Sequence, residues 1–372
     1  MGWSWRLGRV LGIEVYVHFT FMLLLGWVLL IHYFLRQDWG DALEELLFIV
    51  VVFATVLLHE FGHALAARRY GIPTRDITLL PIGGLARLER MPEDPKQELV
   101  VALAGPAVNV ALAAGLSLWL AGTASPPALL GHFAEFGDSL PVRLFHVNVW
   151  LVLFNLLPAF PMDGGRVLRA LLAMRLDYVQ ATQIAAAVGQ GMALLFGFLG
   201  LFGNPLLIFI ALFVWIGASQ EASMVLMKSS LAGIPVSRAM VREFRTLTPD
   251  EPLGQAVRHV VAGFQQDFPV LEGGRVVDVL TRSDILGVLT DRGEGAAVRD
   301  AMQGHFVTAH PAEMLDAALA RMQDGHRRAL PVVRGGNLVG LVTMDNVGEF
   351  LAFQAARRAV RGNGRAERSR EE

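Results

Sequence analysis

Long apolar runs separated by short polar stretches dominate the first 230 residues of the chain. About 20 apolar residues in a helix are enough to cross the roughly 30 Å hydrocarbon core of a bilayer. The pattern predicts six such helices, at about 15–35, 46–70, 97–121, from 142 onward, 184–202 and 205–227. The predicted fold class is therefore a polytopic α-helical membrane protein.

The charges between these runs predict an orientation. Arg6 and Arg9 precede the first helix, Arg68 and Arg69 end the second, and acidic residues fill the loop between them at 38–45. Cytoplasmic segments carry an excess of Lys and Arg. With an even number of crossings, we expect both termini in the cytoplasm and a multi-pass protein of the cell inner membrane.

Residues 74–90 interrupt the helical pattern with an apolar segment that is too short to span. Pro81 and the pair Gly83-Gly84 break it in the middle. Irregular backbone at membrane depth is tolerated where it is buried in protein or lines a cavity, so we predict a re-entrant hairpin. An ordinary cytoplasmic loop is the alternative.

Composition agrees with a membrane protein that carries a soluble part. Hydrophobic residues make up 53% of the chain and charged residues 18%, and the net charge of −2 gives no indication of nucleic-acid binding. Cysteine is absent. Disulfides, zinc–thiolate sites and iron–sulfur clusters are thereby excluded, which leaves histidine and carboxylate as metal ligands.

The second apolar run contains His59, Glu60 and His63. Residues four apart lie on the same face of a helix, so the two imidazoles can bind one ion, and zinc is the expected metal. Glu60 lies on the adjacent face, where a carboxylate can take a proton from an attacking water. Ionisable residues at membrane depth cost about 2.5–3.5 kcal/mol each, so a functional site is favoured over coincidence.

Asp163 is the candidate third ligand. Pro158 and Pro161 forbid a regular helix before it, and Gly164-Gly165 frees the backbone after it. A catalytic zinc takes three protein ligands and one open position, and a carboxylate completes a pair of histidines. The alternative role for Asp163 is to cap the following helix.

Three motifs in this order carry a family resemblance. They are HEFGH at 59–63, GPAVN at 105–109 and NLLPAFPMDGGR at 155–166. Over about residues 12–227 the chain resembles the site-2 protease family of intramembrane zinc metalloproteases. The substrate of such an enzyme is a membrane-spanning segment of another protein, and residues 82–84 resemble the re-entrant element beside the substrate path.

The resemblance also implies roles for individual residues. One zinc ion per chain is held by His59, His63 and Asp163, with Glu60 as general base. Asn109 matches the family's asparagine at the catalytic centre. From the residues alone, an interhelical hydrogen bond is the favoured explanation for Asn109.

An internal repeat follows the apolar runs. Ala239-Met240 recurs as Ala301-Met302, and Thr281 recurs as Thr343, each at an offset of 62 residues. A constant period indicates two copies of one α/β unit. We expect a membrane domain at 1–230, repeat units at 234–295 and 296–354, and a disordered tail at 355–372.

The two copies resemble a pair of cystathionine-β-synthase-type (CBS) domains. The resemblance implies an adenine nucleotide (ATP, ADP or AMP) held by Thr281 and Asp284, and by Thr343 in the second copy. Asn346 replaces the second aspartate, and Asp278 replaces the glycine aligned with Gly340. Both differences disfavour nucleotide binding. The alternative is a structural module through which the chain forms a homodimer.

Two classes of function remain. The first is an intramembrane zinc endopeptidase that acts on single-span membrane proteins in regulated intramembrane proteolysis and is modulated by nucleotide. The second is a transporter or channel gated by its CBS pair, in which the polar cluster forms an ion path. A path would distribute single polar residues over several helices, whereas two imidazoles one turn apart favour a metal site. Glu60 argues against a third reading, an inactive scaffold.

Overall fold

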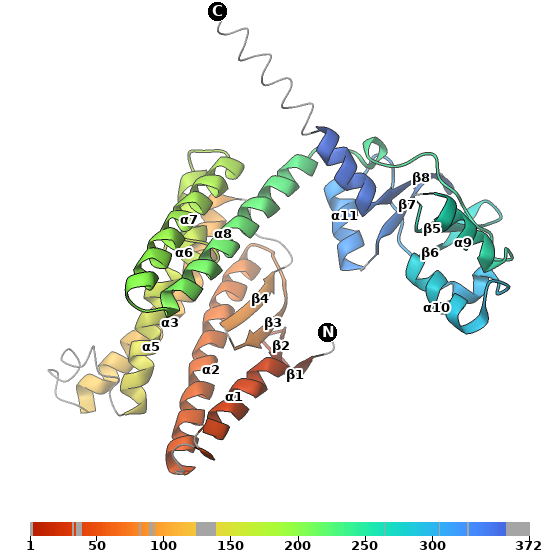
Figure 1. The fold of residues 1–372 in the computed structure, drawn as a ribbon. Helices are drawn as coiled ribbons and strands as arrows, with labels where there is room; N and C mark the ends of the chain where they lie inside the picture. The colour runs from red at the N-terminus through yellow and green to blue at the C-terminus, as the bar shows by residue number, and fades with distance from the viewer. Residues whose placement is uncertain are drawn as a thin grey trace, which may run out of the picture. The chain divides into compact units, whose positions relative to one another are not determined.

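The computed structural model describes residues 3–31, 33–34, 39–81, 83–88, 92, 94–123, 139–263, 265–304, 306–325 and 327–354. The chain divides into two compact units, Met1–Val225 and Leu226–Glu372 (Figure 1). The predicted external loop at 122–141 lies mostly outside the described residues, as do Ile82 of the predicted hairpin and the tail at 355–372.

Apolar helices make up most of the first unit. They are α1 (Phe19–Ile31), α2 (Trp39–Arg69), α3 (Pro95–Thr123), α5 (Leu140–Asn155), α6 (Asp163–Ala173), α7 (Tyr178–Phe202) and α8 (Leu206–Leu231). Within the described residues, α2, α3, α7 and α8 are long and apolar enough to cross a membrane, whereas α1 and α5 are shorter apolar helices. The polytopic α-helical fold is confirmed.

The start of the chain differs from the prediction. Residues expected to open the first membrane helix form the strand β2 (Ile13–His18), and α1 begins only at Phe19. Ile13, Val15 and Val17 are buried while the residues between them are half-buried, which is the period-2 pattern of a strand. A further strand, β1 (Ser4–Val10), pairs with β2 antiparallel.

The predicted hairpin is a pair of strands in the same sheet. β3 (Thr74–Leu80) lies parallel to β2, and β4 (Gly83–Leu88) lies antiparallel to β3. The strand order β1-β2-β3-β4 places β4 at one edge. Ile77 of β3 packs on Phe61 and Ala64 of α2, so the sheet lies against the helix turn that contains the histidines.

Helix boundaries near the metal motifs also differ. The acidic residues predicted in an outer loop continue α2, where Glu44 and Glu45 lie 3.9 and 3.1 Å from the Arg143 guanidinium of α5. The helix expected after the chain break begins at Asp163 itself. Gly164 and Gly165 are helical there instead of turning the chain.

The second unit contains two β-hairpins and short helices. Its elements are η2 (Val236–Arg238), α9 (Leu253–Ala262), β5 (Phe268–Glu272), β6 (Arg275–Leu280), α10 (Arg282–Arg292), η3 (Val298–Ala301), α11 (Leu315–Asp324), β7 (Ala329–Arg334), β8 (Asn337–Thr343) and helical residues 344–354. Phe268 pairs with Leu280 and Leu330 with Val342, so the two hairpins share one register at the offset of 62 residues.

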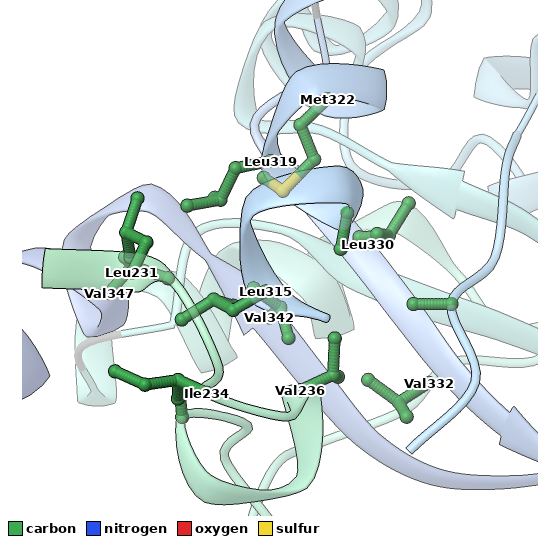
Figure 2. Close-up of a cluster of buried hydrophobic side chains, with 13 residues drawn as sticks. Leu231, Ile234, Val236, Leu315, Leu319, Met322, Leu330, Val332, Val342 and Val347 are labelled. Carbon is green, nitrogen blue, oxygen red and sulfur yellow. The ribbon is translucent and has the colours of Figure 1, made fainter. Parts of the chain in front are cut away.

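Each repeat contributes its first residues to the core of the other. The core of the second repeat includes Leu231, Ile234 and Val236, from the end of α8 and the start of the first repeat (Figure 2). The core of the first repeat includes Val298 and Ala301, from the start of the second. Backbone hydrogen bonds fix this exchange, because the amide of residue 315 donates to the carbonyl of residue 234 at 2.8 Å. The two repeats are interlocked.

Candidate metal centre

Helices α2 and α6 bring three metal-ligand side chains together. His59 and His63 lie one turn apart on α2, and their Nε2 atoms are 3.0 Å apart. Asp163 opens α6, and its Oδ2 lies 3.1 Å from each Nε2. All three side chains are buried. The structure therefore joins the residues that the sequence motifs singled out.

Hydrogen bonds determine which nitrogen of each imidazole faces the Asp163 carboxylate. Nδ1 of His59 lies 2.6 Å from Oδ1 of Asn109, and Nδ1 of His63 lies 2.7 Å from the carbonyl oxygen of Val101. An oxygen of this kind only accepts, so each Nδ1 carries the proton. Each Nε2 consequently directs a lone pair at the carboxylate, which is the arrangement of metal-binding histidines.

The spacing of the three ligand atoms fits a tetrahedral metal. Zn–N and Zn–O bonds of about 2.0–2.1 Å at tetrahedral angles place neighbouring ligand atoms about 3.3 Å apart. Observed separations of 3.0–3.1 Å are close to this value. Two lone pairs and a carboxylate would repel one another without a cation between them. The donor set therefore fits a divalent metal with one open position.

Gly105 of α3 leaves the room for this group. A Cβ atom at this position would lie 2.2 Å from Nε2 of His63 and 2.6 Å from Nε2 of His59. Both distances are far below van der Waals contact. Only glycine fits where α3 passes the two imidazoles.

Glu60 is half-buried and lies beside the edge strand. A Cβ at Gly84 of β4 would lie 2.5 Å from Cγ of Glu60 and 3.1 Å from its Oε1. The absence of a side chain at Gly84 therefore lets the carboxylate rest against the backbone of β4.

The capping alternative for Asp163 does not describe its side chain. Met162 is the N-cap residue of α6, and Asp163 is the first residue of the helix. Its Oδ2 contacts the two histidines, while its Oδ1 lies 3.9 Å from the Arg166 guanidinium. The carboxylate faces the imidazoles.

The CBS-type residues differ between the two repeats. Thr281 and Asp284 bond to each other as a capping box of α10, with the Thr281 hydroxyl 2.5 Å from Oδ2 of Asp284. The pocket that Thr281 lines has a volume of about 10 Å³. Thr343 and Asn346 also bond to each other, but they line a cavity of about 650 Å³. Residues of both repeats line this cavity, and of the two threonines it is Thr343 that faces it.

Asp278 has a structural partner that the sequence did not reveal. Its Oδ2 accepts hydrogen bonds from the amides of Gln303 and Gly304, at 2.6 and 3.0 Å. The carboxylate therefore holds the start of the second repeat against β6. At the equivalent position Gly340, a Cβ would lie 2.6 Å from Sδ of Met240, so a side chain has no room there.

Comparisons with known proteins agree with this geometry. Residues 47–140 and 138–198 match the family described as Peptidase family M50. A zinc metalloprotease of Methanocaldococcus jannaschii is 33% identical over 353 residues, which cover 93% of this chain and 96% of that protein. The chain belongs to peptidase family M50. It is a zinc metalloprotease of the site-2 type, and an integral membrane protein as members of that family are.

Other relatives of this M50 chain cover the same regions. Rip3 of Mycobacterium tuberculosis is 31% identical over 378 residues, covering 93% of this chain and 92% of that protein. A solved site-2 protease from Methanocaldococcus jannaschii is 36% identical and covers 59% of this chain and 95% of that one, with a TM-score of 0.44. Residues 236–291 and 298–352 match the CBS domain. The predicted family and enzyme class are confirmed, and the transporter alternative is set aside.

One residue of the M50 centre was missed from the sequence. Asn148 of α5 is fully buried, and its Oδ1 accepts a hydrogen bond of 2.9 Å from Nδ2 of Asn109. Its own Nδ2 donates to the carbonyl oxygen of Leu144. Asn148 thus fixes which end of the Asn109 amide faces His59. A buried asparagine within an apolar helix was the available signal.

The CBS cavity has an acidic lining. Glu243, Asp267, Asp345 and Glu349 face it, against the cations Arg245 and Arg328. Burial raises the pKa of Asp267, and the nearby Asp345 adds to this effect. A ligand with exposed phosphates would meet these carboxylates unless a cation accompanies it.

Proposed function

We propose that this M50 protease is an intramembrane zinc endopeptidase that cleaves membrane-spanning segments of other proteins, as in regulated intramembrane proteolysis. The observation that carries the proposal is the buried convergence of His59, His63 and Asp163 beside helices of membrane-spanning length. A multi-pass protein of the inner membrane with cytoplasmic termini agrees with the distribution of arginines.

The residues of the centre have distinct roles in this proposal. Zinc would supply the Lewis acidity that makes water nucleophilic near neutral pH and polarises a peptide carbonyl. His59, His63 and Asp163 hold the ion, and Asn109 and Val101 orient the two imidazoles. Glu60 takes the proton of the attacking water and delivers it to the leaving amine.

The edge strand β4 is suited to present the substrate. An edge strand has unpaired backbone groups that can bind an extended peptide by β-augmentation. A helical substrate hides its peptide bonds and has to unwind before cleavage. The position of Gly84 against Glu60 supports an extended substrate held by β4, with the scissile bond next to the base.

Glu60→Gln tests the assignment of the general base. Glutamine keeps the shape of the side chain but cannot take a proton, so hydrolysis of a membrane-embedded substrate should fall at least a hundredfold. Zinc content should stay at one per chain, because Glu60 is not among the three ligands. Glu44→Gln on the same helix is the matched control. Turnover within tenfold of wild type would remove Glu60 from this role.

Asp163→Ala tests the third ligand. Two histidines alone leave the ion under-coordinated, so zinc and activity should be lost together. Elemental analysis of the purified protein measures the zinc content, and cleavage of a membrane-embedded substrate measures the activity. A chain that still holds one zinc ion would show that the third ligand lies elsewhere.

We also propose that the CBS pair binds an adenine nucleotide and modulates cleavage, within a homodimer formed through these domains. The cavity of about 650 Å³ beside Thr343 supports a site there, whereas the pocket beside Thr281 has only about 10 Å³ and would have to widen. ATP, ADP and AMP should be titrated against Thr343→Ala and Asp284→Ala. The variant that loses nucleotide binding identifies the site. If none of the three nucleotides binds the wild-type protein, the CBS pair is a structural or docking module instead.

A further inference from the structure

Arg169 of α6 is the largest fully buried side chain among the described residues. A buried guanidinium needs partners that balance its charge. Its Nε and Nη2 lie 2.8 and 2.5 Å from Oε1 of Glu98 on α3, and its Nη1 lies 2.5 Å from Oε1 of Glu221 on α8. One cation therefore bonds carboxylates of two other helices.

Two of these three helices contribute residues to the metal centre: α6 carries Asp163, and α3 carries the groups that orient the imidazoles. Arg169 follows Asp163 by six residues on α6, roughly 9 Å along the axis at 1.5 Å per residue. Glu98 precedes Val101, whose carbonyl oxygen orients His63, by three residues on α3. The Arg169–Glu98 bond consequently fixes the distance between α6 and α3, and with it the reach of Asp163 toward the imidazoles.

The third helix leads out of this unit. α8 runs without a break from Leu206 to Leu231, whereas the first unit ends at Val225. Leu231, its last residue, is buried in the core of the second CBS repeat (Figure 2). Glu221 lies ten residues earlier, roughly 15 Å along the same helix.

This core also adjoins the cavity that lies between the two repeats. Thr343 and Asn346 line the cavity, and Val347, the next residue, is buried in the same core as Leu231. A ligand that moves residues 343–346 therefore acts on side chains that pack around the end of α8.

We propose that Arg169 is a positioning residue of the metal centre, and that its bond to Glu221 makes α8 the element through which the CBS pair acts on Asp163. The inference rests on the proposed zinc site. When α8 shifts, the Nη1 group of Arg169 either follows Glu221 or loses this half-buried partner. Either response moves α6 relative to α3 and changes the affinity for zinc. Typical coupling between sites changes affinity about five- to 150-fold.

The test compares Glu221→Gln, Leu231→Ala and the double variant in the full-length protein. Zinc affinity is measured by competition with a chelating dye, and the absorption bands of the cobalt-substituted protein report ligand geometry. We expect Glu221→Gln to weaken zinc binding at least fivefold and to shift the cobalt bands. Leu231→Ala should change zinc affinity in wild type but by less than twofold when Glu221→Gln is present.

Controls separate this route from general damage. Ser223→Ala changes an exposed residue on the opposite face of α8 and should leave zinc affinity unchanged. Leu231→Met is the milder variant should Leu231→Ala unfold the second repeat. Two outcomes would overturn this inference but leave the proposed function standing. The first is that Glu221→Gln has the zinc affinity and cobalt bands of the wild type. The second is that the Leu231 substitution has the same effect with and without Glu221→Gln. A wild-type protein that binds no zinc would overturn the proposed function as well.

Discussion

Gly105→Ala adds one methyl group at the most crowded point of the metal centre. The new Cβ would lie 2.2 Å from Nε2 of His63, whereas carbon and nitrogen atoms in contact are separated by about 3.4 Å or more. The imidazole must therefore move by more than about 1 Å. Metal sites tolerate errors of about 0.2 Å in ligand distance. We expect zinc affinity to fall at least a hundredfold and cleavage to become undetectable.

The same substitution should not weaken the helix, which makes the prediction specific. Alanine favours a helix interior over glycine by about 0.8–1 kcal/mol. Gly115→Ala on the same helix is the control, because a Cβ there has no heavy atom within 4 Å. Zinc content, substrate cleavage and circular dichroism should be measured for both variants. One zinc ion per chain and activity within threefold of wild type in Gly105→Ala would refute the geometry described for α3.

Two further predictions concern Asn148 and Asp267. Asn148→Leu removes the acceptor that orients Asn109, so zinc affinity measured by chelator competition should fall about 10- to 100-fold. An unchanged zinc affinity would show that Asn148 does not orient His59 through Asn109. Burial raises the pKa of Asp267, so the folded protein binds this proton more tightly than the unfolded chain, and stability declines as the pH rises through the folded pKa. Asp267→Asn should raise the Tm of the second unit at pH 7 and leave it unchanged below about pH 4. An equal change in Tm at both pH values would show that burial of the charged carboxylate is not what destabilises this unit at pH 7.

The metal centre was largely predictable because its chemistry is local in sequence. The spacing of His59 and His63 on one helix face, and the chain break before Asp163, needed no tertiary information. The strand at Ile13–His18 was missed although its alternation was present, since an apolar run continuing into a helix conceals a period of two. Its polar positions carried the signal.

Features that depend on contacts between distant residues could not be predicted. Asn148 acts through Asn109, 39 residues away, and nothing in its own segment identifies that partner. The two CBS repeats have nearly the same pattern, yet Thr343 lines the large cavity and Thr281 lines a pocket of about 10 Å³. Phe306 and Arg327, which are distant in sequence, line the pocket at Thr281, so the difference is a property of packing.

The interlocked repeats determine when the second unit can be completed during synthesis. Residues 231–236 leave the ribosome about 80 residues before the α11 segment that buries them. Until residues 315–347 have been made, the end of α8 has no core to pack against. A chain cut short between the two repeats would expose the apolar residues of 231–236 to proteases and chaperones, and its first repeat would lack Val298 and Ala301. Loss of one repeat from the gene would therefore disable both, which favours their retention as a pair.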